Sequence, residues 1–160
     1  MANRSTWGVS PDELSRDFLD GLEALQAAVE ERVPPVDEDV RPVTRHRGNI
    51  VVQLGEWPTG KYERVGVEYV PSQVTVFVQI PPQFPTGGGK GFITSPPLER
   101  ADRTGLNNNP WNDQLASAVE REVGDGEVKA YSHNWTNTSM NQPEDMAKFL
   151  DVAEEFLSRG

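Results

Sequence analysis

Three consecutive polar residues, Ser132, His133 and Asn134, are the part of this chain whose types and spacing could support nucleophilic chemistry. A histidine within hydrogen-bond reach activates a serine hydroxyl, and an amide side chain can stabilise an oxyanion, so the triplet could form an ester. Neighbours along a strand point in different directions, however, and we identify no residue that would orient the histidine. The alternative, which we favour, is that Tyr131 and Trp135 pack beneath a proline-rich turn while the polar residues bond to loop backbone.

Other catalytic chemistry is poorly supported. The chain has no cysteine, which excludes thiolate metal sites, disulfides and a cysteine nucleophile. Its two histidines are far apart in sequence, so we expect no metal site and no cofactor. The run Gly87–Lys90 lacks the spaced first glycine and the following Ser or Thr of a phosphate-binding loop.

The charge balance limits the class of partner. With 25 acidic and 15 basic residues the net charge is −10, which argues against nucleic-acid binding and suits a salt-rich, halophilic cytoplasm. No apolar run is long enough to span a bilayer and the first residues lack a signal-peptide core, so we expect a cytoplasmic protein without membrane contact. The basic residues Arg41, Arg45 and Arg47 around His46 could meet an acidic partner, but we favour a solvated linker.

The first half of the chain predicts a helix followed by strands. Ser10 is the expected N-cap of a helix, with Pro11 at its first position and Glu13 closing a capping box, and Pro34-Pro35 ends it. Residues 1–9 are expected to be flexible, and residues 34–47 are expected to link the helix to the sheet. The expected strands are 49–54, 63–70, 73–80 and 91–94.

The second half is less regular. Residues 98–109 have the composition of a loop, and Asn109-Pro110 is expected to start a short helix that ends at Gly124. Asn141 or Gln142 is expected to cap a final helix with Pro143 in its first turn. Its expected apolar stripe consists of Met146, Phe149, Leu150, Ala153 and Leu157.

These elements define a single domain over residues 1–160, of the α+β class. It comprises an N-terminal helix, a four-stranded antiparallel meander with a proline-rich flap, a short middle helix and a C-terminal helix.

The run Ile80-Pro81-Pro82-Gln83-Phe84-Pro85, followed by Tyr131 to Trp135 and then Pro143, resembles the ubiquitin-conjugating enzyme and RWD superfamily, in a divergent prokaryotic branch. In that family a similar turn closes the third strand. The resemblance covers about residues 48–157 and implies a ubiquitin-conjugating-enzyme-like fold. It also implies that Phe84, Pro85, Tyr131 and Trp135 lie together and form a binding surface.

The missing cysteine separates this chain from the thioester-forming members of that family. We therefore expect a binding or scaffolding module whose partners are a ubiquitin-like protein, its activating enzyme, or both, in a conjugation or sulfur-carrier system. Two alternatives stay open. One is a conjugating enzyme that forms an oxyester on Ser132, or less favourably on Thr136 or Ser139, with His133 as base. The other is an unrelated small α+β interaction domain.

Overall fold

The computed structural model describes helices, strands and parts of their connections. The described residues are 7–31, 40–58, 73–84, 91–95, 97, 110–111, 117, 119–121, 128–131 and 141–158. The predicted strand 63–70 and the predicted loop 98–109 lie outside them. So do the Pro34-Pro35 helix stop and the glycine-rich turn.

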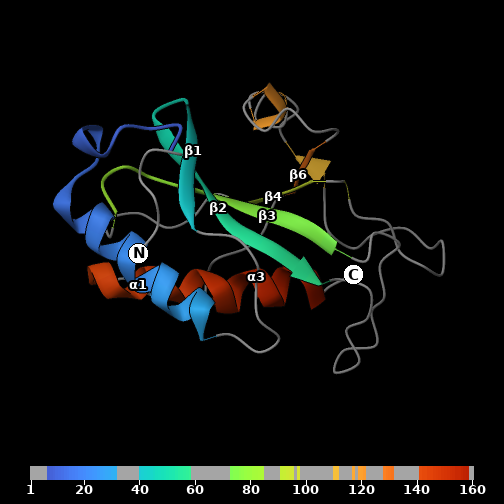
Figure 1. Cartoon of the computed structure of the whole chain (residues 1–160). Helices are drawn as coiled ribbons and strands as arrows, with labels where there is room; N and C mark the ends of the chain where they lie inside the picture. The colour runs from blue at the N-terminus through green and yellow to red at the C-terminus, as the bar shows by residue number, and fades with distance from the viewer. Residues whose placement is uncertain are drawn as a thin grey trace.

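An antiparallel sheet forms the centre of the fold (Figure 1). Among the described residues it has six strands in the order β1-β2-β3-β4-β6-β5. Their bounds are β1 Arg41–His46, β2 Asn49–Pro58, β3 Gln73–Ile80, β4 Phe92–Ser95, β5 Pro110–Trp111 and β6 Lys129–Tyr131. Each neighbouring pair is antiparallel, so the α+β class and the antiparallel sheet expected from the sequence are confirmed, while the number of strands differs.

The first strand corrects our expectation of a linker over residues 34–47. Arg41–His46 pairs with β2, and Pro42 and Val43 are buried. A two-residue turn joins the strands, and both of its residues, Arg47 and Gly48, have positive φ angles, of 50° and 85°. Such a turn matches the twist of a hairpin. Burial of Pro42 and Val43 and pairing with β2 thus outweigh the polar composition that suggested a linker.

The first helix starts later than its sequence signal indicates. Ser10 accepts a hydrogen bond from the backbone N–H of Asp12 at 3.4 Å, and the Ser10 N–H donates to a Glu13 carboxylate oxygen at 3.2 Å. This capping box starts only the 3-10 turn η2, Pro11–Glu13, because Leu14 returns to extended backbone. A second cap, Ser15, accepts from the N–H of Phe18 at 3.1 Å and begins α1, Arg16–Glu30.

The C-terminal helix is present with its predicted cap and burial. Gln142 is the N-cap residue, and the Asp145 carboxylate accepts from the backbone N–H groups of Asn141 and Gln142 at 2.8 and 3.1 Å. The first six residues form the 3-10 helix η3, Pro143–Lys148, and α3 follows as Phe149–Ser158. Four of the five predicted stripe residues, Met146, Phe149, Leu150 and Ala153, are buried, and the Leu157 side chain lies outside the described set.

The middle helix does not begin where we predicted. Pro110 and Trp111 pair with β6 as the strand β5, so the proline at this point starts no helix. Helical backbone is described further on, at Ser117 and residues 119–121, inside the predicted span.

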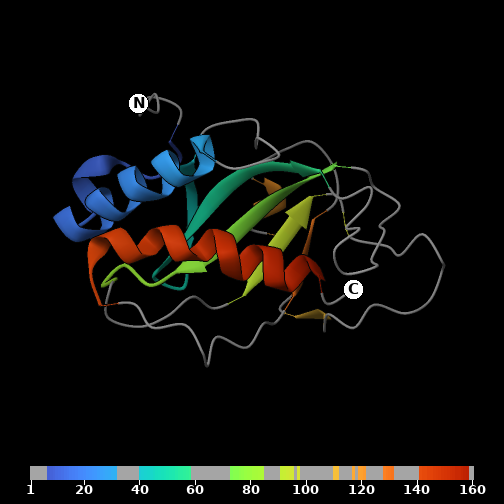
Figure 2. The same cartoon turned by 90° about the horizontal axis from the view of Figure 1, so that it is seen from below.

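Both faces of the sheet bury apolar side chains. Helices α1 and α3 run side by side over one face (Figure 2), where Ile50, Val52, Val78, Phe92 and Tyr131 join the core. On the other face Val51, Phe77, Ile93 and Ala130 pack with Val119 and Val128. Because alternate residues of β2 and β3 are buried on opposite faces, these strands read as nearly continuous apolar runs in the sequence.

The N-terminal residues 7–9, expected within a flexible segment, are held against the edge of the sheet. The N–H of Gly8 donates to the carbonyl of Pro42 at 3.0 Å, and Val9 is buried in the core beside α1. Trp7 is half-buried against the same core.

Candidate functional site

Tyr131, one of the expected binding residues, is a core residue at the end of β6. Its backbone lies between two strands, opposite Phe92 of β4 and Pro110 of β5. The side chain is fully buried in the cluster that joins the sheet to α1 and α3. The Tyr131 side chain therefore packs within the core and is not exposed.

Phe84 is also a core residue. It ends a turn at the close of β3, in which its N–H donates to the carbonyl of Pro81 at 3.1 Å. Its side chain is buried, and its ring lies 6.0 Å from the Phe149 ring of α3 with an interplanar angle of 47°. This tilted contact ties the proline-rich turn to the C-terminal helix. Phe84 and Tyr131 thus share one core, and the expected exposed surface does not include their side chains.

The remaining predicted site residues lie outside the described part of the chain. These are Ser132, His133, Asn134, Pro85 and Trp135. The oxyester site therefore stays a prediction from the sequence. Within the described ranges, no group of three or more His, Asp or Glu residues could hold a metal ion.

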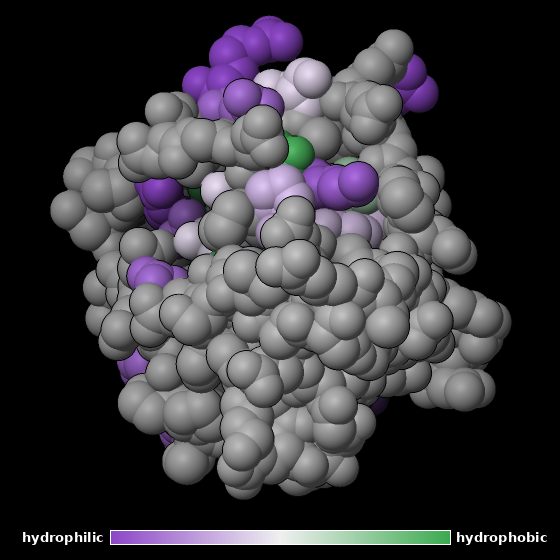
Figure 3. Space-filling model, turned by 90° about the vertical axis from the view of Figure 1, so that its right-hand side faces the viewer, coloured by the Kyte–Doolittle hydropathy of each residue, from purple (hydrophilic) through white to green (hydrophobic). Residues whose placement is uncertain are grey.

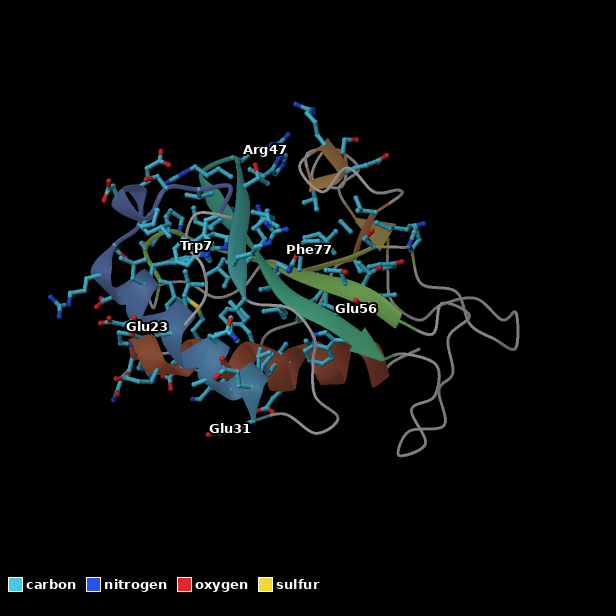
Figure 4. The ribbon with its side chains drawn as sticks, in the orientation of Figure 1. Trp7, Glu23, Glu31, Arg47, Glu56 and Phe77 are labelled. Carbon is cyan, nitrogen blue, oxygen red and sulfur yellow. The ribbon has the colours of Figure 1, made fainter. Side chains whose placement is uncertain are left out.

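Two glutamine side chains of the sheet are buried, and sequence reasoning missed them. Gln53 on β2 and Gln79 on β3 are buried on the face away from α1 and α3, the face on which Phe77 lies (Figure 4). The Gln79 amide donates to the carbonyl of His46 at 3.4 Å and so links β3 to the end of β1. The signal was present in NIVVQL and QVTVFVQI, where each glutamine alternates with apolar residues of the opposite face.

His46 is the last residue of β1, directly before the β1–β2 turn, and its carbonyl accepts from Gln79. Its Nε2 atom is buried and has no hydrogen-bond partner among the described atoms. Burial lowers the pKa of the imidazole, and the neighbouring positive charge of Arg47 lowers it further. The ring is therefore neutral at pH 7, and its Nε2 atom is the buried nitrogen.

The same hairpin concentrates positive charge in an acidic chain. Arg45 and Arg47 are exposed, and Arg41 is half-buried. A guanidinium nitrogen of Arg45 donates to the carbonyl of Glu13 at 3.1 Å, which fixes the hairpin to η2. On the side of the molecule in Figure 3, the described residues that reach the surface are mostly hydrophilic.

Comparison of this chain with protein-family models, with curated proteins and with solved structures gave no match. Within the described residues, the helices are too short or too polar to cross a lipid bilayer.

Proposed function

We propose that this protein is a non-catalytic binding or scaffolding module of a prokaryotic ubiquitin-like conjugation or sulfur-carrier system. The observation that carries the proposal is the position of the proline motif. Ile80 ends the third of the described antiparallel strands, and the turn Pro81 to Phe84 follows it directly. The resemblance to the ubiquitin-conjugating and RWD superfamily places such a turn at the same point.

Packing of the turn supports a role in presenting a surface. Phe84 anchors the turn in the core, whereas Gln83, one residue earlier, is exposed. Phe84 fixes the backbone of the turn, and a partner would contact the exposed Gln83 side chain. A rigid, preorganised surface binds with less loss of conformational entropy than a flexible one.

The composition supports the non-catalytic part of the proposal. Without cysteine the chain cannot carry a ubiquitin-like protein as a thioester. It would instead position a carrier protein, or the enzyme that activates it, for chemistry performed elsewhere.

Calorimetric titration against ubiquitin-like proteins and activating enzymes encoded near its gene tests the binding role. We expect binding to at least one of them, and Gln83→Arg should weaken it about tenfold by placing a long cation in the contact. Ala27→Arg is the matched control, because it makes the same charge change at an exposed position of α1. Failure to bind any candidate would reject the proposal, and equal weakening by both variants would place the surface elsewhere.

Intact-mass spectrometry separates this proposal from the oxyester alternative. In that alternative the Ser132 hydroxyl attacks the thioester of a loaded activating enzyme. The acyl group moves to the serine oxygen, the enzyme's thiol leaves, and His133 takes the hydroxyl proton. After incubation with activating enzyme, ATP and carrier we expect no adduct. An alkali-labile adduct that Ser132→Ala abolishes would show that the protein is a conjugating enzyme and would reject the non-catalytic proposal.

A further inference from the structure

The β1–β2 hairpin is locally basic although the whole chain carries a net charge of −10. Its residues 41–49, called the basic hairpin below, contain three arginines and His46 and no acidic residue. Arg47 lies at the tip, on the side of the hairpin away from α1 and α3 (Figure 4). A compact positive region on an acidic protein favours an anionic partner of limited size.

The backbone at the tip is a second observation that points to a role for Arg47. Its φ of 50° lies in the left-handed region, and Gly48 follows with a φ of 85°. Asn and Gly occupy such turns at lower conformational cost than arginine does. Residues held in unfavourable backbone conformations cluster at functional sites, which makes Arg47 the residue of the hairpin to test.

The edge of β1 limits how a partner can bind. Although β1 is the outermost strand on its side, Pro42 has no N–H, and its carbonyl already accepts from Gly8 at 3.0 Å. The register also shifts between Pro42 and Thr44, as in a β-bulge. These features block the addition of a strand along this edge, so recognition there depends on side chains.

The chemistry of the exposed side chains narrows the partner further. The planar guanidinium of arginine donates two parallel hydrogen bonds to a carboxylate, a geometry that lysine lacks. A long polyanion such as nucleic acid would extend beyond the hairpin into the field of the acidic remainder. A short run of Asp and Glu residues would not extend beyond the hairpin.

We infer that the basic hairpin binds a short acidic segment of a partner protein, with the Arg47 guanidinium at the tip receiving a carboxylate. The Arg45 side chain, already directed by its bond to the Glu13 carbonyl, adds positive charge beside it. This surface goes beyond the proposed function and holds whether or not the partner is a ubiquitin-like protein.

Titration of the ¹⁵N-labelled protein with hexaglutamate, followed by two-dimensional NMR, tests the inference. We expect saturable shifts of amides within residues 41–49 that weaken as salt is added. Hexaglutamine should cause none. The inference would be overturned if hexaglutamate caused no shifts, or if the shifts were centred on other elements. Tighter binding of an oligothymidylate to the same amides would also overturn it.

Arg47→Asn separates binding from folding. Asn is favoured in the left-handed conformation, so this variant should be at least as stable as the wild type. Hexaglutamate should bind to it about tenfold more weakly, because one charge-assisted pair is lost. Arg16→Gln, at the exposed start of α1, removes the same charge elsewhere and should leave affinity nearly unchanged. Equal affinity of Arg47→Asn and wild type would refute the role of the tip.

Discussion

Helix α1 packs closely against Met146 of η3 at Gly21, which makes this position a sensitive test of the packing. A Cβ added there would lie 2.7 Å from Met146 Cε and 3.1 Å from its Cβ and Sδ. Met146 is fully buried, so its side chain has little room to move away. Alanine at this position therefore brings two opposing effects, a better helix former and an overpacked contact.

The two effects differ in magnitude. Replacing a helical glycine with alanine stabilises a helix by about 1 kcal/mol. Inserting a methyl group into a packed core costs about 1–3 kcal/mol. The Met146 Cε, at 2.7 Å, is the nearest obstructing atom, and burial of the side chain leaves it little room to shift. We therefore expect Gly21→Ala to lower the free energy of unfolding by up to about 2 kcal/mol.

The sign should reverse when the obstruction is removed. Met146→Ala alone should destabilise the protein by about 2–5 kcal/mol through loss of buried surface. In that background the Cε and Sδ contacts are gone and only the Cβ contact at 3.1 Å opposes the helix propensity, so Gly21→Ala should stabilise by up to about 1 kcal/mol. Urea unfolding of the four proteins gives the coupling energy directly.

A control on the same helix isolates the propensity. Ala27 is exposed on α1, so Ala27→Gly should cost up to about 1 kcal/mol equally in both backgrounds. If Gly21→Ala has the same effect with and without the Met146 side chain, the close packing between α1 and η3 is refuted.

Three further predictions concern the edge strand and the helix cap. Gly8→Ala would drive a Cβ into the carbonyl of Val43, with the carbonyl carbon at 2.7 Å, so urea unfolding should show a loss of about 1–3 kcal/mol. Burial lowers the pKa of His46 below its usual 6.5, so the unfolded chain binds the proton more readily. Stability should then fall as pH decreases from 6.5 through the lowered pKa, and His46→Gln should flatten unfolding midpoints measured over that range. A hydrogen bond from the backbone N–H of Asn141 is the main cause of the lowered pKa of Asp145. Its stabilisation is present above about pH 4 and lost as pH falls through that pKa, a dependence that Asp145→Asn should remove from an acid titration followed by circular dichroism.

The sequence predicted best where the local signal and the buried pattern agree. The apolar runs of β2 and β3 were identified because their β-branched residues are buried on both faces of the sheet. The capping signal at Ser10 was also real. It starts only a 3-10 turn, however, because Leu14 is extended and a second cap at Ser15 begins the helix.

Strands β1, β5 and β6 were missed because their pairing is set by distant residues. Arg41–His46 has charged residues and a proline, and it becomes a strand through burial of Val43 and pairing with β2. Pro110 is a good first residue of a helix by itself, and only its pairing with Tyr131 makes it part of a strand.

Prediction of the candidate site was limited in the same way. The motif order suggested that Phe84 and Tyr131 belong together, and both belong to one core cluster. Burial of Tyr131 agrees with the packing that we favoured from the sequence, whereas burial of Phe84 was not predicted, since aromatic residues serve both cores and binding surfaces. The backbone carbonyl of His46 accepts from Gln79 of β3, a contact between residues that are distant in sequence.

The position of β6 between β4 and β5 has a consequence for synthesis of the chain. Residues 129–131 complete the pairing of β4, yet they leave the ribosome after both strands that flank them. Until then the outer edge of β4 has no strand to pair with in the described part of the sheet, and Phe92 and Ile93 lack their opposite residues. The nascent protein therefore passes through a stage with an open sheet edge, during which the repulsion between its many carboxylates opposes association with other chains.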